Sequence, residues 1–181
     1  YSHKITDKSN DKSILGKNHF ILGFIYFNEG NYELSIDEYN KASEYFEKAK
    51  VAFQALLEKY DRGYPVEIDQ RLYVYRKLGD LYIRTHDYNE ATQILSRLVD
   101  ESDNKPLVKY KLAIAYGLDG QYAVAIQLLE EVKSLYPDSV VVYSKLGWAN
   151  ALAGNYRQAI SYYNQALVID PTDLFSLFEL G

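Results

Sequence analysis

A period of 34 residues constrains the fold of this chain more than any other feature of its sequence. Residues 146–171 read LGWANALAGNYRQAISYYNQALVIDP, in which two amphipathic segments flank the turn Gly154-Asn155 and Pro171 closes the unit. One period earlier the same slots hold Leu112-Ala113, Tyr116, Gly120, Tyr122, Ala125, Leu129, Val132 and Pro137. Two periods earlier they hold Leu78-Gly79, Tyr82, Tyr88, Ala91, Leu95 and Leu98. Three consecutive units in one register indicate an array of helical hairpins.

Small and large residues occupy defined places within each unit. Counted from Val140 as position 1, Leu146 and Gly147 fall at positions 7 and 8, Ala159 at 20 and Tyr163 at 24. This pattern resembles the tetratricopeptide repeat, a helix–turn–helix unit of 34 residues. The resemblance implies an all-α fold, a right-handed α-solenoid without strands. In such a solenoid, Gly or Ala at positions 8 and 20 lets the two helices cross closely, and each unit buries its open face against the next.

The repeat register predicts the domain organisation. Residues 1–13 are polar and charged and are predicted to form a flexible arm. Residues 14–181 are predicted to form one solenoid domain, whose first helix runs from about Ser13 to Glu29. Within that domain we expect repeat one at about 16–60, a loop at 61–71, repeat two at 72–105, repeat three at 106–139, repeat four at 140–173, and the start of a fifth helix pair or a cap at 174–181.

The second helix of repeat one is longer than the pattern requires. Apolar residues recur there at alternating spacings of three and four, as in a heptad seam: Tyr39, Ala42, Phe46, Ala49, Phe53, Leu56 and Tyr60. The helix is therefore predicted to run from Tyr32 to about Tyr60, where the loop DRGYP stops it. Two interpretations stay open, namely packing along the neighbouring repeat and a strut for docking or dimerisation.

Composition narrows the classes of function. The net charge of −5 argues against a general nucleic-acid binder, and the absence of Cys excludes disulfides and thiolate metal sites. We expect no membrane insertion by this segment and see no signal peptide, which leaves both the cytoplasm and a bacterial periplasm open. The three histidines share no metal-ligand spacing with carboxylates, so we expect no catalytic residue, no metal site and no cofactor.

A partner-binding surface has better support than a catalytic site. Positions 5, 9 and 12 of each first helix lie on one face, and position 2 extends it. In the family that the chain resembles, this face lines a concave groove for a partner peptide. The predicted groove comprises Phe20, Phe24, Phe27, Tyr73, Arg76, Asp80, Ile83, Tyr110, Ile114, Val141, Ser144 and Trp148, and position 2 also adds Leu107. It is mostly apolar, which favours an amphipathic helix or an extended apolar segment, unless the chain's own long helix, arm or C-terminal region fills it.

Four hypotheses on function follow. The first is a non-enzymatic scaffold or adaptor that recruits a protein or peptide partner. The second is a structural subunit that forms a homo-oligomer or larger assembly through its long helix and C-terminal end. The third is an RNA-binding helical repeat, which the acidic charge disfavours. The fourth is a regulatory module of a larger enzyme.

Overall fold

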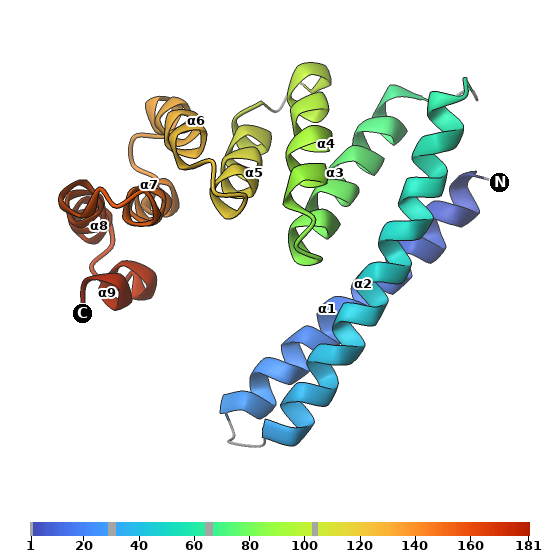
Figure 1. The fold of residues 1–181 in the computed structure, drawn as a ribbon, viewed down its shortest axis with the longest axis horizontal. Coiled ribbons are helices and arrows are strands. Elements are labelled where there is room, and N and C mark those ends of the chain that lie inside the picture. The colour runs from blue at the N-terminus through green and yellow to red at the C-terminus, as the bar shows by residue number, and fades with distance from the viewer. Residues whose placement is uncertain (1, 29–31, 64–66, 103–104) are drawn as a thin grey trace. The chain divides into compact units, whose positions relative to one another are not determined.

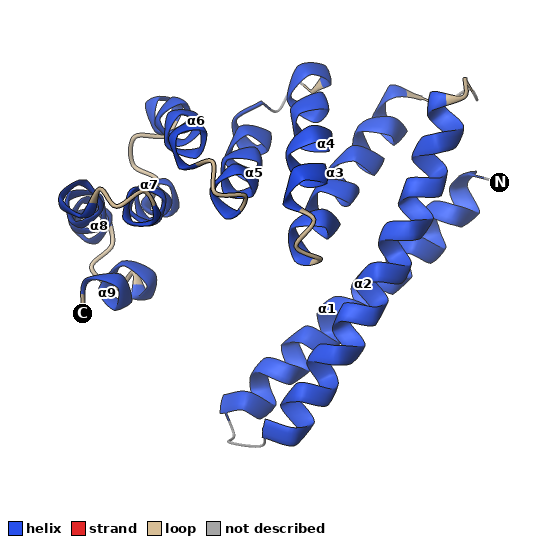
Figure 2. Cartoon of the chain, in the orientation of Figure 1, coloured by secondary structure: helices blue, strands red, loops and turns tan. Residues whose placement is uncertain are grey.

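Helices joined by short turns make up the described parts of the chain. The computed structural model describes residues 2–28, 32–63, 67–102 and 105–181, and within them it contains nine α-helices and no strand (Figures 1 and 2). The helices are α1 (Ser2–Asn28), α2 (Tyr32–Asp61), α3 (Ile68–Arg84), α4 (Tyr88–Glu101), α5 (Lys105–Leu118), α6 (Tyr122–Leu135), α7 (Val140–Leu152), α8 (Tyr156–Ile169) and α9 (Leu174–Leu180). The predicted all-α fold class is confirmed.

The chain divides into two compact units. Unit 1 comprises residues 1–94 and unit 2 comprises residues 95–181, so the boundary falls within α4. The expectation of a single solenoid domain over residues 14–181 stays a prediction.

In unit 1, α1 and α2 lie side by side as a long antiparallel hairpin (Figure 1). They approach closely at Gly16, where an added Cβ would lie 2.6 Å from Cε1 of Phe46. The heptad seam predicted on α2 is buried along its described length, at Ala42, Phe46, Ala49, Phe53, Leu56 and Tyr60. Helix α2 runs from Tyr32 to Asp61, which confirms its predicted length, and its apolar stripe forms part of the core of this unit.

The N-terminus of α1 departs from the sequence prediction. The helix begins at Ser2 rather than near Ser13, so the segment expected to be an arm is helical. Residues 2–13 contain neither Gly nor Pro, and α1 continues beside the C-terminal half of α2 (Figure 1). Most helical stability in proteins comes from packing against a neighbour, which explains why a polar sequence extends the helix here.

The α2 extension also packs on α3. The ring of Phe53 contacts that of Tyr73 edge-on, with centroids 6.3 Å apart, and Gln54 Nε2 donates a hydrogen bond of 3.0 Å to the hydroxyl of Tyr82. This arrangement supports the first interpretation of the long helix, packing along the neighbouring repeat. Helix α3 begins at Ile68, so the loop expected at 61–71 is shorter than predicted.

One backbone turn recurs between the two helices of repeats two, three and four. Its central residue has positive φ, at 63° for His86, 81° for Gly120 and 79° for Gly154. The N–H of the next residue bonds to a carbonyl of the preceding helix, from Asp87 to Tyr82 (2.9 Å), from Gln121 to Tyr116 (2.8 Å) and from Asn155 to Asn150 (2.9 Å). This is the Schellman arrangement of a helix C-terminus. The next helices then start in register at Tyr88, Tyr122 and Tyr156.

Unit 2 is built from the pairs α5–α6 and α7–α8, with α9 against α7 and α8. Its core consists of Ala113, Ala125, Leu129, Val132, Val142, Leu146, Ala149 and Tyr162. In α7 a Cβ on Gly147 would lie 2.5 Å from Cδ1 of Tyr163 in α8. The resemblance implied a close crossing at Gly147, which is at position 8, and in this repeat the ring of Tyr163, at position 24, fills the space beside it.

Candidate functional site

In unit 1 the predicted groove residues separate into two places. Phe20 of α1 and Ile83 of α3 line one cavity of about 480 Å³ together with residues of α2. Tyr73 and Arg76 lie elsewhere on α3, where the guanidinium Cζ of Arg76 is 5.9 Å from the centroid of the Tyr73 ring. Asp80 is half-buried on the same helix. The side chains of Phe24 and Phe27 lie outside the described residues.

In unit 2 the structure brings two of the predicted groove residues together. Tyr110 and Val141 face one cavity of about 250 Å³ between the start of α5, the end of α6 and the start of α7. Its other lining residues are Pro106, Leu107, Val132, Tyr136, Ser139 and Val142. The walls are almost entirely apolar, and burial raises the pKa of the Tyr110 phenol.

Part of this cavity was not predicted from the sequence. Val132 and Tyr136 come from the end of α6 and the turn after it, whereas the predicted groove used first helices only. Tyr136 is 52% exposed at the position just before Pro137. In the sequence, the signal for this residue was an aromatic side chain directly before the proline that closes the repeat.

Ser144 holds α9 in place. Its side chain is buried, and its hydroxyl donates a hydrogen bond of 2.7 Å to Asp173 Oδ2 and lies 2.9 Å from Ser176 Oγ. The same Asp173 oxygen accepts a hydrogen bond of 3.0 Å from the backbone N–H of Ser176, which caps α9. The groove position of repeat four is thus covered by the next helix of the chain itself.

Trp148 packs between the first helices of repeats three and four. It is half-buried at the edge of the unit 2 core, over Gly117 of α5. Lys145 lies close by, with Nζ 5.6 Å from the Trp148 ring centroid and 4.2 Å from that of Phe175. Burial lowers the pKa of Lys145, opposed by the charges of Glu179 and Asp173. Ile114, on α5, is also half-buried.

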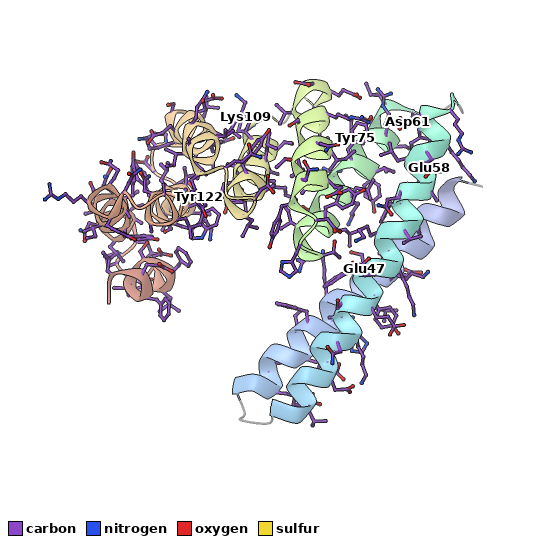
Figure 3. The ribbon with its side chains drawn as sticks, viewed as in Figure 1. Glu47, Glu58, Asp61, Tyr75, Lys109 and Tyr122 are labelled. Atoms are coloured by element: carbon purple, nitrogen blue, oxygen red, sulfur yellow. The ribbon has the colours of Figure 1, made fainter. Side chains whose placement is uncertain are left out.

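An ion pair in unit 2 joins α5 to α6 outside the cavity. Lys109 Nζ of α5, labelled in Figure 3, lies 2.5 Å from Glu131 Oε2 of α6. That hydrogen bond lowers the pKa of Glu131 against the opposing effect of burial. The pair fixes the α5–α6 hairpin beside the apolar cavity.

The described residues contain no cluster of three or more His, Cys, Asp or Glu side chains that could hold a metal ion. His19 Nδ1 lies 2.5 Å from Glu38 Oε2, and its ring stacks on Tyr45. His86 Nδ1 lies 2.5 Å from the hydroxyl of Tyr88. None of the helices in the described ranges is both long and apolar enough to cross a bilayer.

The C-terminal end of unit 2 exposes large apolar side chains. Leu174 and Phe178 of α9 are 80% and 82% exposed, and Val168 of α8 is 83% exposed. Phe175 instead packs edge-on against Tyr163, at a centroid distance of 6.2 Å. An apolar surface of this kind commonly marks an interaction site.

Comparison with known families and structures places this geometry in context. Two family models described as tetratricopeptide repeat match the chain, over residues 17–48 and 106–171. No curated protein sequence matches it.

Solved structures resemble the chain in fold. One is YrrB, described as a TPR protein with an unusual peptide-binding site, at 16% identity and a TM-score of 0.64 over 99% of each chain. MamA from Desulfovibrio magneticus matches at 17% identity and a TM-score of 0.61, over 94% of this chain and 82% of that chain. The first TPR of Spaghetti (RPAP3), bound to an HSP90 peptide, matches at 23% identity and a TM-score of 0.55, over 61% of this chain and 88% of that chain. The helices of this chain therefore form an all-α TPR solenoid fold.

Proposed function

Because the chain belongs to the tetratricopeptide-repeat family, we propose that it is a non-enzymatic scaffold that holds a protein partner through an apolar or amphipathic segment. The observation that carries this proposal is the apolar cavity of unit 2. At its mouth Leu107, Tyr136 and Val141 are 50%, 52% and 55% exposed, and Val132 and Val142 are buried at its base. An open apolar site with a formed base suits an apolar side chain of a partner.

The energetics favour a segment with several anchors. Burying one Leu- or Phe-sized side chain contributes about 1.5–3 kcal/mol, which by itself gives weak binding. A partner helix presents further apolar side chains at spacings of three and four residues, and an extended segment at spacings of two. The peptides bound by the first and second TPR domains of RPAP3 support the idea that this fold holds short segments.

A peptide library displayed on phage tests the proposal. The chain is used for selection, and the selected peptides are measured by calorimetry against the chain and against Val141→Asp. We expect apolar or amphipathic peptides that bind Val141→Asp at least tenfold more weakly. Val168→Asp is the matched control, because Val168 is 83% exposed and does not line the cavity. Failure to select peptides, or equal binding to both variants and the chain, would contradict the proposal.

Self-association is a second candidate, favoured by the exposed C-terminal end of unit 2. Leu174 and Phe178 would be covered if α9 met another copy of the chain. Sedimentation at increasing concentration should then show a defined oligomer that Phe178→Asp dissociates. Leu135→Asp, at a residue 60% exposed on α6, should leave that oligomer intact. A monomer at every concentration would rule this candidate out.

A further inference from the structure

A second cavity, in unit 1, lies between α1, α2 and the C-terminal end of α3. It has a volume of about 480 Å³ and differs from the unit 2 cavity in having a polar rim. Its apolar walls come from Phe20, Ala42, Phe46 and Ile83, and the rim includes Glu47, Arg84 and His86. Phe46 and Ala42 are buried, whereas Phe20 is 47% exposed at the opening. The volume is within the range of natural binding sites, about 300–1,000 Å³.

The charges around this cavity are unequally compensated. Lys50 Nζ lies 2.9 Å from Glu47 Oε2 and 2.5 Å from Asp87 Oδ2, so two carboxylates share one ammonium and the three groups together keep one net negative charge. Burial opposes the charge of Lys50, but the hydrogen bonds to Asp87 and Glu47 outweigh it and raise the pKa of this lysine. Glu47, labelled in Figure 3, therefore shares its counter-charge with Asp87.

Arg84 is the exception among these charged groups. Its side chain is exposed, its guanidinium Cζ lies 5.1 Å from the centroid of the Phe46 ring, and it forms no ion pair within the described residues. A guanidinium held against an aromatic face keeps its donors at the edge of its plane, where a carboxylate can accept two hydrogen bonds. Apolar walls beside such a cation are complementary to a ligand with an apolar group and an adjacent anion.

We propose that this cavity binds a peptide segment in which an apolar side chain is followed directly by an Asp or Glu side chain. The apolar side chain enters between Phe20, Phe46 and Ile83, and the carboxylate pairs with Arg84. The site goes beyond the unit 2 cavity, and only the peptide nature of its occupant rests on the proposed function. Its specificity is distinct, because it requires a negative charge and the unit 2 cavity does not.

Two matched dipeptides test this site by NMR titration of the full chain. N-acetyl-Phe-Glu-amide carries the required carboxylate, and N-acetyl-Phe-Gln-amide replaces it with a neutral group of the same shape. We expect the Glu peptide to shift the amide signals of residues 42–47 and 83–86 at about millimolar concentration. The Gln peptide should bind about two- to fivefold more weakly, as expected for one exposed charge pair.

Variants separate this site from the proposed function. Arg84→Gln should abolish the preference for the Glu peptide, and Arg84→Lys, which keeps the charge without the planar fork, should restore part of it. Val141→Asp should leave both titrations unchanged. Equal binding of the two peptides to the chain, or amide shifts elsewhere only, would overturn this site while leaving the phage-selected peptides of unit 2 unaffected. Conversely, loss of the unit 2 peptides alone would contradict the proposed function and not this site.

Discussion

The indole of Trp148 lies over the backbone of Gly117, which belongs to the preceding repeat. A Cβ placed on Gly117 would come within 2.6 Å of Cζ3 of that ring. Gly117, at position 12 of repeat three, therefore leaves space for the large side chain of Trp148, at position 9 of repeat four. This pairing fills the space between α5 and α7 and draws the only Trp of the chain into a structural role.

Gly117→Ala should displace the Trp148 ring. The added methyl group meets the outer atoms of an indole that is only half-buried, so the ring moves toward solvent more readily than the helices separate. We expect the tryptophan emission to shift to the red and the free energy of unfolding to fall by about 1–3 kcal/mol. Leu118→Ala, at the next and partly exposed residue, is the control that should leave the emission unchanged. Unaltered emission in Gly117→Ala would contradict the packing described.

Gly147→Leu should be more destabilising than Gly117→Ala. A Cβ at this position would lie 2.5 Å from the ring of Tyr163, whose side chain is 2% exposed and cannot move outward. Overpacking of a core costs about 1–3 kcal/mol or more, and here an entire Leu must be accommodated. Urea unfolding measures the loss. Gly181→Leu provides the comparison, because its Cβ would be 3.6 Å from the nearest atom, an ordinary contact.

Substitutions at the recurring turn should change the free energy of unfolding in opposite directions in two repeats. His86 and Gly120 occupy equivalent places with φ of 63° and 81°. A residue with a side chain is disfavoured there by about 1–2 kcal/mol, partly offset by the backbone entropy that Gly loses on folding. His86→Gly should therefore raise the free energy of unfolding by up to about 1 kcal/mol, and Gly120→Ala should lower it by about 1 kcal/mol. Urea unfolding measures both changes. If both variants were less stable than the wild type, the contact of His86 with Tyr88 would outweigh the backbone strain at His86.

Alkaline pH should weaken the attachment of α9. Burial raises the pKa of the Tyr163 phenol above its usual value of 10.0, and the charge of Glu179 and the hydrogen bond to it act in the same direction. The neutral phenol is thus favoured in the folded state, so its stabilisation is complete below pH 10 and is lost as the pH rises above that value. The free energy of unfolding should fall more steeply above pH 10 in the wild type than in Tyr163→Phe.

A matched variant controls for the other tyrosines. Tyr156 is 68% exposed on the same helix, so Tyr156→Phe should keep the wild-type dependence on pH. Identical slopes for the wild type and Tyr163→Phe between pH 8 and 11 would refute the assignment to Tyr163.

Much of the fold was predictable because the repeat is encoded locally. The starts of the second helices at Tyr88, Tyr122 and Tyr156 follow from the 34-residue register. The length of α2 follows from an apolar stripe at heptad spacing. His86 adopts the same turn conformation as Gly120 and Gly154 at the equivalent positions. The hydrogen bonds of the turn are therefore kept even where the sequence has no glycine.

The candidate sites were predictable only in part. Periodicity placed Tyr110 and Val141 on one face, and the structure adds Val132 and Tyr136 from another helix to the same cavity. It also shows that Ser144, on the predicted face, is buried beneath α9. A helical pattern states which residues share a face, but it does not state which neighbouring element covers that face.

By itself the sequence determined the helical class, the repeat register and the buried stripe of α2, because each depends on residues within one or two turns of each other. Tertiary structure alone decided that α1 begins at Ser2 and that the ring of Trp148 lies over Gly117. It also decided that Arg84 lies over the Phe46 ring and forms no ion pair within the described residues. These features depend on contacts between residues far apart in sequence. They form only where two helices approach closely enough. That distance is set by side-chain volume and packing, and the periodicity of the sequence does not encode it.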